Sequence, residues 1–187
     1  MLRLIGAAAI ALASLGAAHA GTITVSGFAH GYSGSTVAVA PEATLTSYGA
    51  QLYFGGAYSD PNSFCAIDFG GTCEASLNIS FNDVIKNLKF DVGGWDPGDF
   101  VDLSVYGVGD ALLGSVGLSS DVTGLDLSGF GSITRLFFAD SSTGAGLGYA
   151  NFSFDKVASV PVPAGLPLLA GALAAAFAVS RRKKTQA

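Results

Sequence analysis

Apolar and polar residues alternate in short runs through the middle of the chain, between Gly21 and Val157. A period of two is typical of a β-strand that has one buried face and one solvated face. The clearest runs are Thr22–Phe28, Ala75–Phe81, Lys86–Val92, Phe100–Tyr106, Ser132–Ala139 and Tyr149–Asp155. Weaker runs are Thr36–Ala40, Thr44–Phe54 and Leu112–Leu118. The pattern therefore predicts an all-β body.

Clusters of turn-forming residues separate these runs, such as "GGWDPGD", "YGVGD" and "DSSTGAG". Short strands at this spacing, each with one polar face, predict an antiparallel β-sandwich or jelly roll. Phe, Leu and Val side chains from the two inner faces would form its core. Asn82–Leu88 fits either one helical turn or the start of the next strand.

The first twenty residues have the pattern of a secretory signal peptide. Arg3 precedes an apolar run from Leu4 to Ala18, and Ala18-His19-Ala20 fits a small-x-small cleavage site. A short N-terminal membrane anchor is the alternative. We expect residues 1–20 to be the signal peptide, residues 21–158 a β-sandwich ectodomain that begins at Gly21, and residues 159–187 a separate C-terminal segment.

The chain has two cysteines, Cys65 and Cys73, on either side of the Gly70-Gly71 pair. In an oxidising compartment an even cysteine count predicts a disulfide, so we expect these two residues to be joined. Two free thiols are the alternative. A zinc site is disfavoured, because no histidine lies near the two cysteines.

Charge is distributed unevenly along the chain. All fourteen acidic residues lie between Glu42 and Asp155, whereas five of the nine basic residues lie at the two ends, so the body is more acidic than the net charge of -5 suggests. Phosphate binding needs a basic face, and the composition therefore argues against nucleic acid as a partner. An acidic body is compatible with divalent cations.

The densest group of polar residues is "DVGGWDPGDFVD", which contains Asp91, Asp96, Asp99 and Asp102 around a Pro-Gly turn. Hard oxygen ligands on a tight loop suit calcium, so these four residues are the candidate metal ligands and calcium the candidate ion. A solvated acidic turn is the alternative. Trp95 at the tip would either stack on a sugar ring or plug the end of the sandwich.

Residues with catalytic chemistry are scarce. After the predicted signal peptide the chain contains one histidine, His30, and its neighbours "GFAHGY" include no acid to position it as a base. The Gly-rich runs lack the phosphate-binding patterns. Carboxylates facing each other across a cleft would make a glycosidase, but a sequence does not show such facing. We therefore expect no catalytic residues and a protein that is not an enzyme.

The last segment combines prolines, an apolar run and a basic end. Val160-Pro161-Val162-Pro163-Ala164 precedes an apolar stretch that continues to Val179 and is followed by Arg181, Arg182, Lys183 and Lys184. The stretch is slightly shorter than the 17 to 25 residues of most transmembrane helices, and the cations would act as a stop-transfer signal on the cytoplasmic side. We expect a C-terminal transmembrane helix with the body outside the cell.

This segment, "VPVPAGLPLLAGALAAAFAVSRRKK", resembles the C-terminal sorting signal of VPLPA-CTERM proteins, a variant of the PEP-CTERM class. The resemblance implies an exported protein of a Gram-negative bacterium that an exosortase-type membrane peptidase cuts near Val160–Ala164. The precursor would be tethered to the inner membrane and the body then sent to the cell surface or released. Val162 stands where leucine is usual.

The body is also similar to those that many such proteins carry, in the stretches "FDVGGWDPGDFVDLSVYG", "ITRLFFADS" and "YANFSFD". Relatives often have an acidic pair before the last aromatic strand, and Ala150-Asn151 stands there instead. Proteins of this class are associated with exopolysaccharide and biofilm matrix. We expect a structural or interaction role there; a lectin-like, calcium-assisted carbohydrate-binding module is the alternative, and a polysaccharide hydrolase the third class.

Overall fold

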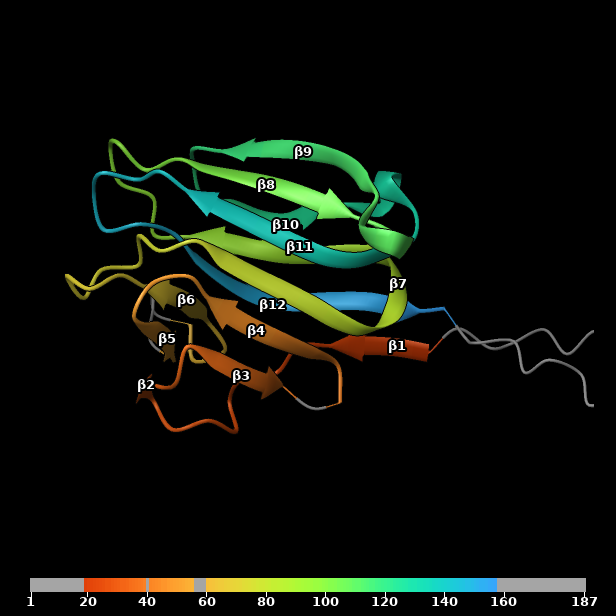
Figure 1. Cartoon of the computed structure of the whole chain (residues 1–187), viewed down its shortest axis with the longest axis horizontal. Coiled ribbons are helices and arrows are strands. Elements are labelled where there is room, and N and C mark those ends of the chain that lie inside the picture. Colours follow the sequence, from red (N-terminus) through yellow and green to blue (C-terminus); the bar gives the residue numbers. More distant parts are fainter. Residues whose placement is uncertain (1–18, 40, 56–59, 158–187) are drawn as a thin grey trace, which may run out of the picture. The chain divides into compact units, whose positions relative to one another are not determined.

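The computed structural model describes residues 19–39, 41–55 and 60–157, and these form antiparallel strands with two short 3₁₀ helices (Figure 1). The strands and 3₁₀ helices are β1 (His19–Thr22), β2 (Gly31–Tyr32), β3 (Thr36–Val39), β4 (Ala43–Ser47), β5 (Gln51–Phe54), β6 (Phe64–Ile67), β7 (Leu77–Gly93), β8 (Val101–Tyr106), η2 (Val108–Asp110), β9 (Leu112–Leu118), β10 (Val122–Asp126), η3 (Ser128–Phe130), β11 (Ile133–Asp140) and β12 (Gly148–Lys156). The all-β prediction is confirmed.

The long strand β7 organises the sheet, because its two halves pair with different neighbours. Its first half lies between β4 and β11, and its second half pairs with β12 and β10. One ladder runs β3-β4-β7-β11-β8-β9 and the other runs β2-β5-β6-β12-β7, with β1 also on β12. Backbone hydrogen bonds thus connect all twelve strands through β7, instead of forming two unconnected sheets.

Aromatic side chains from the two ladders meet between them. Phe138 of β11 and Tyr149 of β12 lie 4.2 Å apart between ring centroids, although their strands do not pair. Phe81 and Phe154 meet edge to face at 5.3 Å. The ladders therefore face one another across a shared core. Full burial of a large apolar side chain contributes roughly 1.5–3 kcal/mol, and Phe54, Phe64, Phe90, Phe138 and Phe152 are each at most 1% exposed.

Two local predictions differ from the structure. Asn82–Leu88 contains no helical turn and lies wholly within β7, where Asn87 takes a left-handed φ of 53°. The predicted strand Thr22–Phe28 pairs only at its start, because β1 begins at His19 and ends at Thr22. Ile23 and Val25 are nevertheless buried, so the alternation in the sequence reports the inward face correctly even where the ladder has ended.

The ends of the chain carry several predictions that the structure does not address. The predicted signal peptide, apart from His19 and Ala20, and the whole of the predicted sorting segment 159–187 lie outside the described residues. Cleavage after Ala20 would remove the first two residues of β1 and leave the Gly21–Phe154 and Thr22–Ser153 pairs. Within the residues that are described, no helix is long and apolar enough to cross a bilayer.

Candidate functional site

Cys65 and Cys73 are joined by a disulfide, as the sequence predicts. The bond connects β6 to a segment that also meets the loop before β12, since the Cys73 N–H donates to the Ala145 carbonyl at 3.0 Å. Cys73 and Gly146 form a parallel bridge there. The disulfide therefore fixes one end of the body, where β6 and the start of β12 come together.

The four aspartates proposed as calcium ligands do not converge. Among the described residues, no group of three or more His, Cys, Asp and Glu side chains is placed to hold a metal ion. Asp102 lies on the exposed face of β8, between Ala139 and Gly117. Because a strand holds its side chain away from the preceding turn, Asp102 does not contribute to a loop site.

The carboxylate of Asp99 is used within the protein. Asp99 is 3% exposed, and its carboxylate accepts hydrogen bonds from the Asp96 N–H at 2.8 Å and the Gly146 N–H at 3.3 Å. Asp99 thus stabilises the turn between β7 and β8. Trp95 in the same turn is 40% exposed, and its backbone N–H donates to Asp121.

Asp91, the first of the four, points to a different place on the surface. It accepts a hydrogen bond from the Gly124 N–H at 2.6 Å and another from the side-chain amide of Asn151 at 2.8 Å. The same Asn151 nitrogen donates to Asp60 at 3.0 Å. Two carboxylates that are 31 positions apart in the sequence are therefore held close together by one amide group.

A β-bulge in β12 puts Asn151 in this position. Ala150 pairs with Asp91 and Ser153 with Lys89, so β12 has one more residue than β7 over this interval. Tyr149, Phe152 and Phe154 all enter the core, and the extra residue places Asn151 on the outer face. Asn151 takes a φ of 55°, a left-handed conformation that asparagine tolerates better than most residues.

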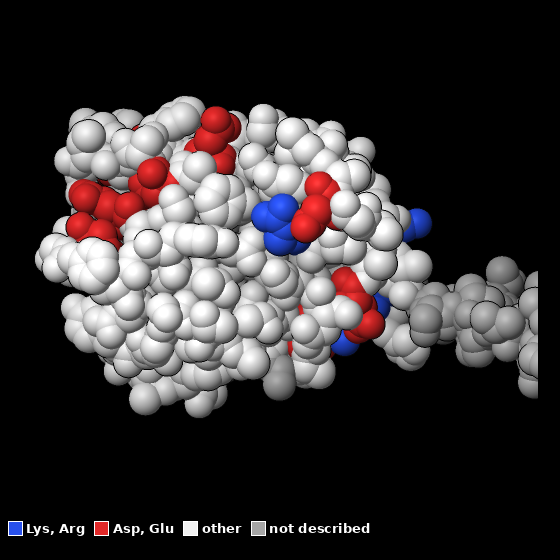
Figure 2. Space-filling view, viewed as in Figure 1, with Lys and Arg blue, Asp and Glu red and all other residues white. Residues whose placement is uncertain are grey.

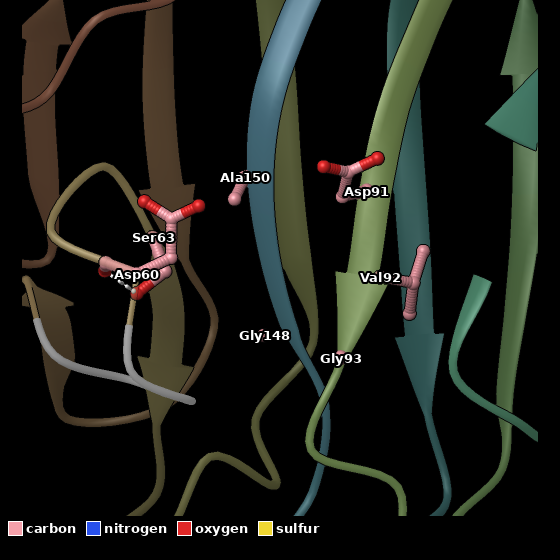
Figure 3. Close-up of a pocket in the computed structure, with 7 residues that line it drawn as sticks. All are labelled: Asp60, Ser63, Asp91, Val92, Gly93, Gly148 and Ala150. Carbon is pink, nitrogen blue, oxygen red and sulfur yellow. Dashed lines mark hydrogen bonds between the residues drawn. The ribbon is translucent and has the colours of Figure 1, made fainter. Parts of the chain in front are cut away.

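A pocket of about 140 Å³ opens beside the bulge (Figure 3). The carboxylates of Asp60 and Asp91 stand on opposite sides of it, with Ala150 on the strand between them. Ser63, Val92, Gly93 and Gly148 complete the lining. The pocket exists because small residues form its floor: Gly93 and Gly148 have no side chain and Ala150 has only a methyl group.

A second cavity of about 250 Å³ lies on the other side of Asn151. Its lining consists of Thr22, Ile23, Thr24, Asn62, Asn151, Phe152 and Ser153. The Oδ1 atom of Asn62 is buried and finds no hydrogen-bond donor among the described residues. No residue lines both cavities, but the two are neighbours. Asp60 and Ser63 of the first and Asn62 of the second belong to one loop, and Ala150 and Asn151 are consecutive residues of the bulge.

The face shown in Figure 2 is largely uncharged, with acidic side chains gathered at the end where β8 begins and β11 ends. At that end, burial raises the pKa of Asp140, and the charges of Asp99 and Glu74 raise it further.

Two other polar side chains on the surface make contacts with aromatic rings. Arg135, on β11, lies 3.6 Å from the ring centre of Tyr106 and pairs with Asp110. His30 is exposed and contacts the Tyr53 ring edge to face.

Sequence reasoning identified Asp91 but assigned it to the wrong group of side chains, and it did not identify Asp60 or Asn62. Asp60 directly precedes Pro61, which is typical of an ordinary turn. The sequence signal at Asn151 was the break in alternation at "YANF", where two residues instead of one separate the core residues Tyr149 and Phe152. Comparisons with protein-family models, with curated proteins and with solved structures give no match to this chain.

Proposed function

We propose that this chain is an exported surface or extracellular-matrix protein. Its role is structural or interactive, without catalysis, in the exopolysaccharide or biofilm matrix. The observation that supports this most directly is the Cys65–Cys73 disulfide, because such bonds persist in oxidising compartments and are rare in the cytosol. It agrees with the signal-peptide pattern of residues 1–20 and with the sorting pattern of residues 159–187.

In this proposal the C-terminal segment is the sorting signal that directs the folded body to its destination. The signal peptide takes the chain across the inner membrane, and the apolar run up to Val179 holds it there by its basic end. An exosortase-type peptidase then cuts near Val160–Ala164 and passes the body to the cell surface. β12 ends at Lys156, so the cleavage motif begins within a few residues of the folded body.

A lectin-like role, in which the body binds a saccharide directly, is the second candidate. Two neighbouring cavities lined by carboxylate, amide and hydroxyl groups favour it, because these groups form the hydrogen bonds that sugar hydroxyls require. The described residues hold no set of carboxylates that would bind calcium, so this role is proposed without a metal ion.

Fractionation of a Gram-negative host tests the proposed export and sorting. The full chain is produced in two strains, one with its exosortase and one with that peptidase deleted. We expect the body at the surface or in the medium of the first strain and in the inner membrane of the second. Recovery of the reduced, uncut chain from the cytoplasm of both strains would overturn the proposal.

A further inference from the structure

We infer that the two cavities on either side of Asn151 form one binding site for a neutral sugar unit of a polysaccharide. The inference rests on the proposed surface role only because export brings polysaccharide within reach of the body. The site is defined by Asp60, Asp91, Asn62 and Thr24 around the Asn151 bulge.

The hydrogen-bonding groups of the site call for a ligand that donates many hydrogen bonds. Carboxylates accept and do not donate, and the buried Asn62 Oδ1 is an acceptor that lacks a donor among the described residues. The Asn62 oxygen is covered by its surroundings, so the carboxylates and the exposed hydroxyls are the groups that a ligand would meet. Sugar hydroxyls both donate and accept, and Thr22, Thr24 and Ser153 offer hydroxyls that can do the same.

Charge excludes the anionic alternative. Asp60 and Asp91 face each other across the first cavity, so a uronate or phosphate group would be placed against two like charges. Neither cavity has a lysine or arginine in its lining. The site therefore favours a neutral saccharide over an acidic one.

A cation is disfavoured by what already lies between the carboxylates. The Asn151 amide nitrogen donates to Asp91 at 2.8 Å and to Asp60 at 3.0 Å. The opposite orientation of this amide would place its oxygen against two carboxylates, so the donating orientation is the favourable one. The amide thus takes the position that a bound cation would need, and it leaves the outer lone pairs of both carboxylates for a ligand.

The size of the cavities limits the ligand to a small unit. Their volumes of about 140 and 250 Å³ are each below, and together only at the lower end of, the roughly 300–1,000 Å³ of sites for drug-sized molecules. A single sugar unit, at a chain end or a branch, suits such a space better than a long segment of polysaccharide. Ala150 is 6% exposed and lies on the floor of the first cavity, so a larger side chain there would occupy the site.

Calorimetric titration of the purified full-length chain tests this inference. The protein is kept in an amine-oxide detergent, which has no sugar headgroup, and titrated with neutral oligosaccharides of glucose, galactose or mannose, with oligogalacturonate, and with calcium alone. We expect binding of at least one neutral oligosaccharide. Ala150→Leu and Asp91→Asn should each weaken it at least about tenfold, because they fill the cavity or remove a charged acceptor.

Two further variants distinguish a loss of binding from a loss of folding. Thr24→Val keeps the shape of an exposed side chain and removes one hydroxyl from the second cavity, so it should weaken binding severalfold without lowering the melting temperature. Asp102→Asn, on β8, is the matched control and should bind like the parent. The inference is overturned by no binding of any neutral saccharide at about 10 mM, by binding confined to oligogalacturonate or calcium, or by undiminished affinity in the cavity variants. Each of these results would leave the fractionation test of export unaffected.

Discussion

Phe90 of β7 and Phe152 of β12 stack face to face, with ring centroids 4.6 Å apart and planes within 2° of parallel. Phe152 lies between Asn151 and Ser153, so its ring anchors the bulge to the core while Asn151 faces outward. The core contact and the outer site thus depend on the same short segment of β12.

Replacement of Phe152 by alanine is expected to destabilise the body strongly. Removal of a fully buried phenylalanine costs about 3–5 kcal/mol in the free energy of unfolding, because transfer energy is lost and a cavity remains. Urea denaturation measures the change, and Phe152→Leu should cost clearly less because it retains most of the apolar volume. Equal stability of Phe152→Ala and the parent would contradict the described core.

Loss of the disulfide is expected to cost about 2–3 kcal/mol, since a bond between residues eight positions apart closes a short loop. The double variant Cys65→Ala, Cys73→Ala removes the bond without leaving a free thiol. Denaturation of both proteins with and without reductant measures the effect, and reductant should lower the stability of the parent alone.

The pH dependence of stability should carry opposite contributions from two aspartates. Burial and the neighbouring charges of Asp99 and Glu74 raise the pKa of Asp140 above its ordinary value of 3.8. The folded state then holds this proton more tightly than the unfolded state, so the contribution of Asp140 to stability falls as the pH rises above 3.8. Asp140→Asn should therefore raise the melting temperature at pH 7, since its amide oxygen can still accept from the Ser142 N–H.

Asp126 provides the contrasting case. A hydrogen bond from the Ser128 N–H, with further help from the Ser128 side chain and Lys89, lowers the pKa of Asp126 to about 2. Its contribution is fully present above pH 3.8 and is lost as the pH falls through about 2. Asp126→Asn should lower the melting temperature at pH 7 and have no effect below pH 2. Shifts of the same sign in both variants would show that the two environments are misassigned.

The local alternation of apolar and polar residues predicts the strands of this protein better than it predicts which strands pair. β8 and β11 follow the expected alternation closely, because one face of each strand is buried and the other is solvated. β6 was missed because all four of its residues are buried, which removes the period of two. The helical alternative for Asn82–Leu88 fails because β7 continues through it, and its neighbours come from distant parts of the chain.

The candidate site depends even more on long-range contacts. Asp91 is brought to Asn151 by strand pairing and to Asp60 by the loop that precedes β6, and neither contact leaves a local trace in the sequence. The bulge itself does leave one, since "YANF" interrupts the alternation at Ala150-Asn151. The sequence could therefore have indicated an irregularity there, but not which carboxylates it would face.

Substitutions in the basic end and in the proline motif of the sorting segment should both prevent cleavage, but they should leave the uncut protein in different places. Replacement of Arg181–Lys184 by serine should allow the tail through the membrane and give uncut protein in the periplasm, because each cation costs roughly 2.5–3.5 kcal/mol at the bilayer centre. Replacement of Pro161 and Pro163 by alanine should leave uncut protein in the membrane, because the prolines keep the cleavage motif out of helix and sheet. Identical locations for the two variants would contradict this division of roles.

Mass spectrometry of the mature chain from its native host tests the central claim, export followed by removal of the C-terminal segment, most directly. We expect a protein that begins at Gly21 and ends near Val160–Ala164, with a mass two hydrogens lower than that of the reduced chain because of the Cys65–Cys73 bond. A mature chain that still carries Arg181–Lys184 would show that the segment is a permanent anchor and would contradict the account.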